Sequence, residues 1–488
     1  MSDPLIRARL DKLAALREKG IDPYPARVPA VERMAAVVDR FASIGAEEHT
    51  DETVTVAGRQ MAVRGMGKAS FRDLRDGTGR IQIHAATDRL GADRYAALSD
   101  TDIGDYLAIR GEVFRTKRGE LTIAADEWTL LSKSIRPLPE KWHGLRDVEM
   151  RYRHRSLDLI ANDDVRETFV KRSKILSAIR RTLDEDGFLE AENPVLQMVA
   201  SGGHARPFVT HHNTLDTDLY LRIALELHLK RLLIGGLERV YEMGKCFRNE
   251  GVSTEHNPEF TMLEIYQAYA DYEDMMRVIE RLVYAGLDAI GQAPQVEFKG
   301  QPVDLTLPWK CLSMVDAVAE ATGIDREAIR TEAAIQQAVV EGVAPRPDSP
   351  GEAIEALFGI HVEPNLVDPT FVIDYPVEIS PLAKRKADDE GLVERFELFV
   401  GGVELANAFT ELNDPVDQRA RFEDQERLRA LGNEETQPID EDFLYAVEHG
   451  MPPAGGMGVG VDRLIMLLTG SPSIRDVILF PAMRRKTT

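Results

Sequence analysis

The stretch FRNEGVSTEHNPEFTMLEIY, residues 247–266, contains two predicted strands joined by a turn-rich loop. Arg248 ends the first strand, and glycine, serine, asparagine and proline mark the loop. The second strand runs from about Phe260 to Tyr266, and its side chains alternate between two faces. Leu263 and Ile265 lie on the face expected to join the core. The opposite face is predicted to line a pocket and carries Phe260, Met262, Glu264 and Tyr266.

Glu264 is expected to have a positively charged partner, because a carboxylate on a half-buried strand is costly unless a cation or hydrogen-bond donors meet it. The local segment supplies no such partner. A distant arginine or lysine could complete an internal salt bridge, which is the commoner case for an isolated buried glutamate. A bound ammonium group would also serve, and the surrounding motif favours it. We therefore interpret residues 247–266 as an ATP site joined to an amine site.

The composition indicates a globular protein of two or three domains, since the chain has 488 residues and is 43% hydrophobic. Its formal net charge of -22 argues against non-specific coating of nucleic acid, because phosphate is repelled at long range. Any RNA contact is expected on local basic patches, although solvated surface is the commoner case for any one such patch taken alone. The candidates are the N-terminal helix, the series Arg64, Lys68, Arg72, Arg75 and Arg80, the cluster Arg115, Lys117 and Arg118, and the tail Arg484, Arg485 and Lys486.

The two cysteines, Cys246 and Cys311, lack metal-ligand spacing and are expected to be buried free thiols, which suits a reducing compartment. The N-terminus has no continuous apolar run of the kind a signal peptide needs. No segment reaches membrane-spanning length. The sequence therefore predicts a cytoplasmic protein without a membrane partner.

Residues 53–133 are predicted to form a five-stranded barrel of the oligonucleotide-binding (OB) type, preceded by a helical extension over residues 1–52. Short β segments separated by turns support this interpretation. Phe71 and Gln82 could offer a stacking ring and an amide to an unstacked base, although Phe71 could equally belong to the barrel core. Residues 134–150, with Pro137 and Pro139, form a predicted linker.

Residues 151–488 form a predicted second domain. It begins with a long amphipathic helix over residues 164–186 and then an edge strand, Phe188–Val195, in which Pro194 cannot donate to a sheet. This helix and strand could build a dimer seam. A further helix is predicted from Ala224 to Ile234 and carries Glu226. Residues 324–363 are helical and acidic, and we interpret them as an insertion outside the site.

Residues 394–409 are predicted to form a hairpin whose loop is Gly401-Gly402. If Val400 pairs with Val403, Glu397 lies diagonal to Glu404 on one face. The two carboxylates would repel each other unless a cation lay between them. Mg²⁺ that also holds phosphate oxygens suits this arrangement, whereas two exposed glutamates on an edge strand are the alternative.

A second polar set follows on the same strand, with Asn407, Phe409 and Glu411 at alternate positions. Strict alternation would point this set away from Glu404. Either a bulge lies near Leu405-Ala406 or only one set faces the ligand, and the sequence leaves both possibilities open.

A glycine-rich strand, Gly455–Gly460, precedes a predicted helix near the C-terminus. Asp462 is expected to cap this helix, and Arg463 to lie in its first turn. An arginine beside a helix N-terminus suits a polyphosphate. The glycines could also serve tight helix-on-sheet packing or a dinucleotide loop, although no strand precedes them in a βαβ unit.

Together these segments resemble class II aminoacyl-tRNA synthetases, and specifically lysyl-tRNA synthetases of the bacterial type. Motif 1 of that family corresponds to the helix ending near Gly187 and to Pro194, motif 2 to residues 247–266, and motif 3 to Gly456–Arg463. HNPEFTMLEIY at 256–266 and ELND at 411–414 are close to the lysine-specific pattern. The resemblance covers most of the chain. It implies an α+β fold in which the barrel is followed by an antiparallel sheet flanked by helices.

The resemblance also implies a reaction and its partners. The lysine carboxylate would attack the α-phosphorus of ATP to give lysyl-adenylate and pyrophosphate, and the lysyl group would pass to the 3′ end of tRNA(Lys). Mg²⁺ would be the cofactor, with ATP and L-lysine as substrates, and the protein would be a homodimer. Such chemistry depends on positioning and charge neutralisation more than on a protein nucleophile.

The family pattern assigns roles to matching residues of this chain. Arg248 and Arg463 are the expected catalytic residues. ATP contacts are expected from Arg248, Glu250, His256, Asn257, Phe260, Glu397, Glu404 and Arg463. Glu397 and Glu404 would bind Mg²⁺. Lysine contacts are expected from Gly202, Glu226, Arg248, Glu264, Tyr266, Asn407, Phe409 and Glu411, with Glu411 and Tyr266 at the ε-ammonium. Anticodon contacts are expected from Phe71, Gln82 and Glu120.

Two places depart from the family pattern. The loop Gly202–Pro207 is a residue short and contains an inserted histidine, His204, while Leu225 and His228 flank Glu226 where proline and tyrosine are expected. These departures concern the geometry around Gly202. A shorter relative that modifies a protein lysine lacks the barrel, and a non-enzymatic relative would be expected to have lost Arg248, Glu404 or Arg463.

Overall fold

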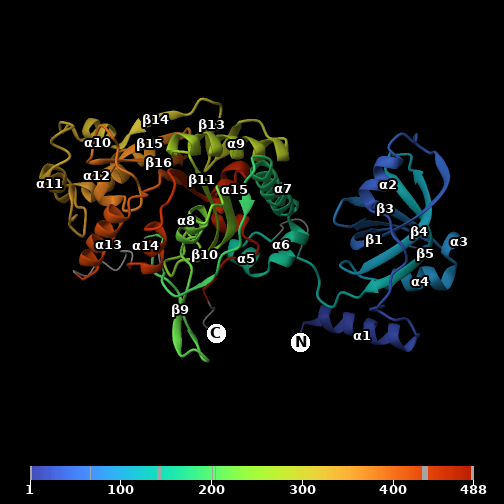
Figure 1. Cartoon of the computed structure of the whole chain (residues 1–488). Coiled ribbons are helices and arrows are strands. Elements are labelled where there is room, and N and C mark those ends of the chain that lie inside the picture. Colours follow the sequence, from blue (N-terminus) through green and yellow to red (C-terminus); the bar gives the residue numbers. More distant parts are fainter. Residues whose placement is uncertain are drawn as a thin grey trace. The chain divides into compact units, whose positions relative to one another are not determined.

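The structure, a computed structural model, describes residues 3–65, 67–139, 145–200, 202–203, 205–430 and 438–484. The chain divides into two compact units, residues 1–145 and 146–488 (Figure 1). Residues 140–144 of the predicted linker, together with His204, Arg485 and Lys486, lie outside the described residues. Among the helices that are described, none is both long and apolar enough to cross a membrane.

The N-terminal unit is built around a closed barrel with strand order β1-β2-β3-β5-β4, which confirms the predicted five strands. The strands are β1 (His49–Arg64), β2 (Ala69–Arg75), β3 (Arg80–Ala86), β4 (Tyr106–Arg115) and β5 (Leu121–Ser132). The long β1 pairs with β4 up to Arg59 and with β2 from Arg59 onward, and a register shift after Gln60 marks its bend. The helices of this unit are α1 (Pro4–Glu18), α2 (Met34–Arg40), α3 (Thr87–Leu90) and α4 (Ala92–Ser99).

Arg72 is not part of a basic surface, contrary to the expectation from sequence. Alternation along β2 turns Ser70, Arg72 and Leu74 inward, and Arg72 is only 1% exposed. Its guanidinium donates hydrogen bonds to Gln60 Oε1 at 2.7 Å and Thr101 Oγ1 at 3.0 Å. Burial lowers its pKa to about 10. The same alternation places Phe71 on the outer face, outside the barrel core.

The C-terminal unit contains an eight-stranded sheet in the order β14-β15-β16-β17-β18-β11-β10-β6. Its strands are antiparallel from β15 to β10 and parallel at both edges. The bounds are β14 (Lys310–Ser313), β15 (Thr370–Pro376), β16 (Leu392–Val400), β17 (Val403–Thr410), β18 (Ala454–Gly460), β11 (Glu259–Ala268), β10 (Arg239–Phe247) and β6 (Leu189–Glu190).

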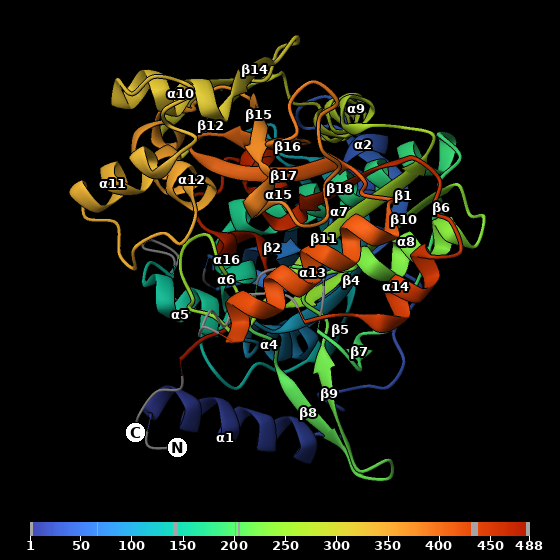
Figure 2. The ribbon, with the colours of Figure 1, turned by 60° about the vertical axis from the view of Figure 1, so that its left-hand side comes forward.

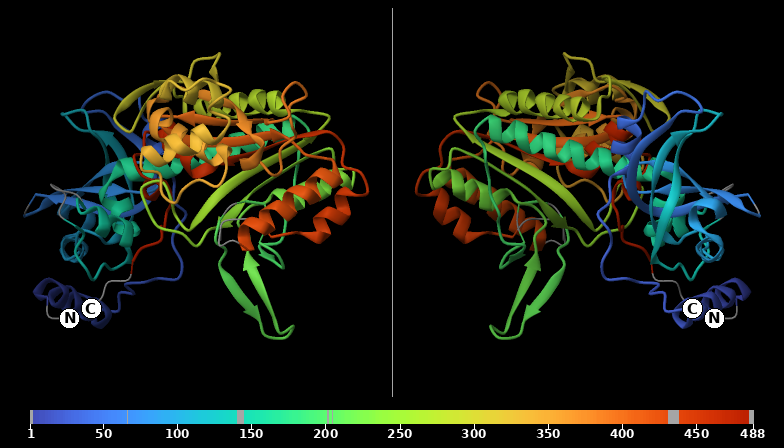
Figure 3. Two further views of the ribbon diagram at one scale, coloured as in Figure 1. Left: turned by 90° about the vertical axis from the view of Figure 1, so that its left-hand side faces the viewer. Right: turned by 90° about the vertical axis from the view of Figure 1, so that its right-hand side faces the viewer.

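Helices cover both faces of this sheet (Figure 3). On one face α7 (Asp163–Glu185), α9 (Tyr272–Ile290) and α15 (Val461–Thr469) share the main core with the sheet. On the other face α8 (Glu226–Ile234), α13 (Pro415–Ala430) and α14 (Glu441–Val447) form a second apolar cluster. Figure 2 shows α13 crossing in front of the central strands. The long helix predicted at 164–186 and the helix predicted at 224–234 are confirmed as α7 and α8.

The predicted edge strand Phe188–Val195 is wrong in length. Only β6 forms, and it lies at the sheet edge, parallel to β10. After β6, the backbone and side chain of Asn193 both donate to Glu242 Oε2, and Pro194 has no N–H group. The chain therefore leaves the ladder early. It continues into a separate three-stranded sheet of β7 (Leu196–Gln197), β8 (Val209–His212) and β9 (Thr217–Leu221).

Residues 324–363 contain α11 (Glu332–Val340) and α12 (Pro350–His361), which with α10 (Met314–Thr322) pack on β15 and β16 in a core of their own. Cys246 is buried as expected. Cys311 on β14 is exposed, so the expectation that both thiols are buried is wrong. The remaining elements are α5 (Val148–Arg153), α6 (Arg155–Ala161), β12 (Gln295–Phe298), β13 (Gln301–Asp304), η1 (Glu363–Asn365), η2 (Val377–Ile379) and α16 (Ile474–Val477).

Candidate active site

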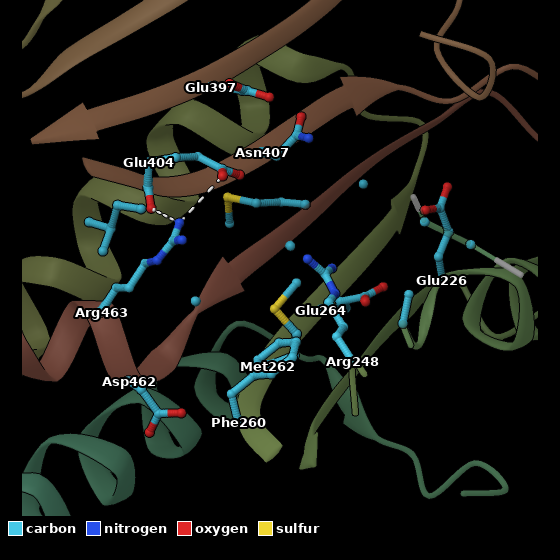
Figure 4. A pocket seen from close by; sticks show the side chains of 18 of the residues that line it. Glu226, Arg248, Phe260, Met262, Glu264, Glu397, Glu404, Asn407, Asp462 and Arg463 are labelled. Atoms are coloured by element: carbon cyan, nitrogen blue, oxygen red, sulfur yellow. Dashed lines mark hydrogen bonds and ion pairs between the residues drawn. The ribbon is translucent and has the colours of Figure 1, made fainter. Parts of the chain in front are cut away.

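A cavity of about 390 Å³ lies on the sheet face opposite α7 and α9. Its walls come from loop 202–203, the start of α8, loop 248–258, residues 379–383, strands β11 and β16 to β18, and the start of α15. In Figure 4, Glu226 lies toward one end and Arg463 toward the other. Segments from most of the second unit therefore meet at one place.

Strand β11 divides its side chains between this cavity and the core. Phe260, Met262, Glu264 and Tyr266 line the cavity, while Leu263 and Ile265 are buried in the main core. The alternation predicted from residues 260–266 is confirmed. It arises because the face of β11 that packs on α7 and α9 is apolar.

Strand β18 lies between β11 and β17, antiparallel to both. It is therefore a sheet strand and not a dinucleotide loop. A Cβ atom on Gly456 would lie 1.9 Å from Glu411 Oε1 and 2.4 Å from Tyr266 Cε1. Glycine is required here because the two polar side chains close over the backbone.

One end of the cavity is strongly acidic. Glu264 is 3% exposed, accepts a hydrogen bond from Leu225 N at 2.8 Å and another from Tyr266 Oη at 3.1 Å. Burial, then repulsion by Glu226, raises the pKa of Glu264 to about 7. Burial likewise raises the pKa of Glu411 to about 8, although Lys230 opposes the shift. Glu226, Glu264 and Glu411 thus converge, with Arg248 on the wall of the same cavity.

Lys230 is a residue of this end that sequence reasoning missed. Its Nζ lies 2.6 Å from Glu226 Oε1 and also forms an ion pair with Glu411 Oε2. The four-residue spacing from Glu226 on α8 was a usable signal, because such residues share a helix face. Glu411 is fully buried behind the cavity wall and does not line the cavity itself.

The other end carries cationic and aromatic groups. The guanidinium of Arg248 lies 5.2 Å from the ring centroid of Phe260, and Arg248 Nε is buried without a hydrogen-bond partner among the described residues. Arg463 donates to Glu404 O at 2.7 Å and to His256 Nε2 at 3.2 Å. Burial and then Arg463 lower the pKa of His256, which suits a neutral ring that accepts this bond.

Asp462 does not cap α15, as the sequence had suggested. Gly460 is the N-cap, and the Asp462 carboxylate accepts from Thr261 N at 2.7 Å and pairs with Arg172 at 2.7 Å. Arg463 lies in the first turn, as expected. Arg172 on α7 thereby joins motif 1 to motifs 2 and 3, and no local sequence signal pointed to it.

A bulge in the β16–β17 hairpin brings both polar sets to one face. Val400 pairs with Val403, as predicted, and Phe399 pairs with Glu404, but Leu398 pairs with Ala406. Leu405 is therefore the extra residue of a bulge. As a result Glu397, Glu404, Asn407 and Phe409 all line the cavity.

Glu397 has a partner that was not foreseen. Arg395 Nη2 lies 2.6 Å from Glu397 Oε1, and Arg395 Nε donates to Asn407 Oδ1 at 3.1 Å. Burial raises the pKa of Glu397 to about 7, while Arg395 lowers it. Glu404 is more open and touches Arg463. The position of Arg395, two residues before Glu397 on one strand, was a readable signal.

Glu397 and Glu404 offer two carboxylates on one face of the cavity. Their oxygen atoms are hard donors, which fit Mg²⁺ that also binds phosphate. Among the described residues, no group of three or more His, Cys, Asp or Glu side chains is placed to hold a metal ion.

The remaining expected contacts lie on the cavity wall. Gly202, with a φ of 87°, packs on the start of α8, and Glu250 lines the mouth. Asn257 also lines the cavity, but its side chain bonds the backbone of Glu259 at 2.5 Å and Ala482 at 3.0 Å.

A second groove lies on the barrel and contains Phe71, Gln82 and Glu120. Phe71 lies 4.9 Å from the ring of His84, which in turn lies 6.2 Å from Phe114. Gln82 Oε1 accepts a hydrogen bond from Thr122. Five basic residues of the predicted patches line the same groove: Arg64, Arg80, Arg115, Lys117 and Arg118.

Comparisons with known proteins give a family match for each of the two units. Residues 147–484 match the family of class II tRNA synthetases (D, K and N), and residues 54–131 match the OB-fold nucleic acid binding domain. The chain is 54% identical to a lysine–tRNA ligase of Moorella thermoacetica over 99% of this chain and 98% of that relative. It is 50% identical to the lysine–tRNA ligase of Bacillus subtilis over 99% of this chain and 97% of that relative.

Proposed function

The chain belongs to the lysine–tRNA ligases of the class II tRNA synthetase family, and we propose that it activates L-lysine with ATP and transfers it to tRNA(Lys). The observation that carries the proposal is the convergence of Glu226, Glu264 and Glu411 beside Arg248. Lys230 supplies one cation for three buried carboxylates, and the uncompensated charge is costly to bury, so the site suits a ligand that carries ammonium groups.

In the proposed complex the α-ammonium of lysine meets Glu226, Glu264 and the backbone of Gly202. The ε-ammonium meets Glu411 and Tyr266, flanked by Asn407 and Phe409. Selectivity follows because a side chain without an ammonium would leave buried carboxylates unpaired. The lysine carboxylate then lies toward Arg248, whose Nε has no partner among the described residues.

Adenylate formation requires the lysine carboxylate oxygen to attack the α-phosphorus while pyrophosphate leaves. Arg248 holds the two negative groups together, Phe260 stacks on adenine, and Arg463 reaches the outer phosphates with His256. Glu250 and Asn257 contact the nucleotide from the loop. Mg²⁺ held by Glu397 and Glu404 supplies charge neutralisation at the phosphate oxygens when bound.

Transfer follows when the terminal hydroxyl of tRNA attacks the lysyl carbonyl carbon and AMP leaves.

We assign anticodon reading to the barrel groove, where Phe71 offers a stacking ring and Gln82 and Glu120 offer polar groups. In this proposal the charging of tRNA takes place in the cytoplasm, where translation consumes the product.

A homodimer is proposed on the basis of exposed apolar residues around the motif 1 edge. Leu189 is 52% exposed, Met198 64% and Val209 58%, and these side chains lie on or beside β6 to β8. A second copy would bury them. Sedimentation velocity should show twice the chain mass, and a monomer at micromolar concentration would contradict this assignment.

The function is tested by ATP–pyrophosphate exchange with each standard amino acid in turn. Exchange should depend on lysine and exceed the rate with any other amino acid. Stronger exchange with aspartate or asparagine, or none with lysine, would overturn the proposal.

A further inference from the structure

We propose that Lys230 is a built-in ammonium that fixes the charge of the amine pocket and so makes it specific for a ligand with two ammonium groups. The acidic end of the pocket has the carboxylates of Glu226 and Glu264 on its wall and that of Glu411 buried directly behind the wall. Lys230 neutralises one of these charges, which leaves two for the α- and ε-ammonium groups of lysine. The inference rests on the proposed function and assigns the chain's own cation a part in its specificity.

The geometry of Lys230 is that of a bridge. It lies on α8 one turn after Glu226, and its Nζ contacts one oxygen of Glu226 and one of Glu411. The side chain is completely buried, so these carboxylates take the place of water. The two acids come from parts of the chain that are distant in sequence, and Lys230 fixes their separation.

The bridge leaves the other carboxylate oxygens free. Glu411 Oε1 is buried, has no hydrogen-bond partner among the described residues and faces the backbone of Gly456. Glu264, in contrast, is held by Leu225 N and Tyr266 Oη and makes no ion pair in the described part of the chain. Glu411 therefore combines a fixed position with an unused acceptor, which is what an incoming ammonium requires.

The surroundings keep Lys230 charged. Nζ lies 5.5 Å from the ring centroid of Phe409 and 6.0 Å from that of Phe443. Burial opposes the charge, but Glu226 and Glu411 raise the pKa of Lys230 above its ordinary value. Arg248 on the cavity wall is the other cation and is assigned to the lysine carboxylate, and the remaining titratable groups near Lys230 are Glu264, Tyr266 and Cys246. None of these last three groups is a cation.

Replacing Lys230 by a neutral side chain should make Glu411 take up a proton, because a buried carboxyl without its cation favours the neutral form. The ε-ammonium then loses its ionised partner. In Lys230→Met the KM for lysine in exchange should rise by roughly tenfold or more at neutral pH, while the KM for ATP stays within about twofold. Lys230→Arg keeps the charge and should stay closer to wild type.

Lys245→Met is the matched control, because the Lys245 side chain on β10 is 41% exposed and pairs only loosely with Glu259 at 3.7 Å. Its lysine KM should match wild type. Thermal melting of all variants separates a folding defect from a pocket defect. If Lys230→Met does not fold, Lys230→Gln and Lys230→Arg provide the comparison of neutral with charged side chains.

Proton release distinguishes a charge role from a merely structural one. Calorimetry of lysine binding in buffers of different ionisation enthalpy gives the number of protons released. Because loss of Lys230 raises the pKa of the Glu411 carboxyl further, the neutral variant should release more protons per lysine bound than wild type or Lys230→Arg. Its lysine KM should also keep falling at pH values where the wild-type KM has become constant.

An unchanged lysine KM and proton count in a folded neutral variant would overturn the inference. A lower melting temperature with an unchanged lysine KM would also overturn it, since Lys230 would then have a structural role only. Wild-type exchange is measured first. If wild type fails to activate lysine, the proposed function fails, whereas normal wild-type exchange with unaffected variants rejects only the role of Lys230.

Discussion

Arg248 lies where the two halves of the reaction meet, between the acidic end of the cavity and the face of Phe260. Arg248→Ala should reduce lysine-dependent exchange by roughly 100-fold or more, because removing a charge-stabilising donor costs about that much. Stability should change little, since Arg248 Nε makes no hydrogen bond in the described part of the chain.

Arg277→Ala is the control for this variant, because Arg277 is 60% exposed on α9, on the far face of the sheet. It should retain wild-type exchange. Wild-type exchange in Arg248→Ala, with melting curves unchanged in both variants, would contradict the role given to Arg248.

At the scale of residues, the sequence predicted the acids of the pocket better than the cations that hold them. Glu264 was predicted from the alternation of β11, and Glu226 and Glu411 from family motifs. Lys230 was not, because its contact with Glu411 joins residues far apart in sequence. Asp462 was given a local capping role, but its partners are the distant Arg172 and Thr261. Local patterns do not contain such long-range contacts.

At the scale of elements, β18 determines how closely the acidic side chains can approach the sheet. In Gly456→Ala, the new methyl group would overlap Glu411 Oε1 and the Tyr266 ring. The lysine KM should rise by roughly tenfold, and unfolding should become easier by about 1–3 kcal/mol, as for other overpacked sites. Exchange kinetics and thermal melting measure the two effects.

Gly359→Ala gives the contrast, since Gly359 is exposed on α12 and a Cβ there meets only Glu363 Oε2 at 3.8 Å. This variant should keep its lysine KM and gain roughly 0.5 kcal/mol of stability. A normal lysine KM in Gly456→Ala would mean that the backbone at this point does not border the amine pocket.

Element types were predictable where the side-chain pattern was periodic, as in α7, β11 and the β16–β17 hairpin. The bulge at Leu405 could not be predicted, because alternation alone allowed either a bulge or two separate faces. The length of β6 was also beyond reach, since the bonds from Asn193 to Glu242 that end it depend on tertiary contacts.

At the scale of the whole molecule, the two units are expected to separate activation from tRNA recognition. Phe71→Ala should raise the KM for tRNA by roughly tenfold, because stacking of one base on an aromatic ring is worth about 1–3 kcal/mol. Lysine-dependent exchange should be unaffected. Tyr106→Ala is the control, since Tyr106 is an exposed barrel aromatic outside the Phe71 groove.

An equal loss of exchange and of tRNA charging in Phe71→Ala would show that the barrel is not a separate reader. The sequence predicted this barrel, and the family resemblance named Phe71, Gln82 and Glu120, which the structure places in one groove. It misplaced Arg72, whose inward orientation follows from the register of β2. Although the whole chain has a net charge of -22, this groove is lined by several basic side chains.

The most direct test of the amine pocket is a crystal structure of the protein with L-lysine and a non-hydrolysable ATP analogue. The ε-ammonium should lie within hydrogen-bond distance of Glu411 and Tyr266, with the lysine carboxylate at Arg248 and Lys230 still bridging Glu226 and Glu411. Lysine bound elsewhere, or an ε-ammonium that displaces Lys230 from both carboxylates, would contradict the account.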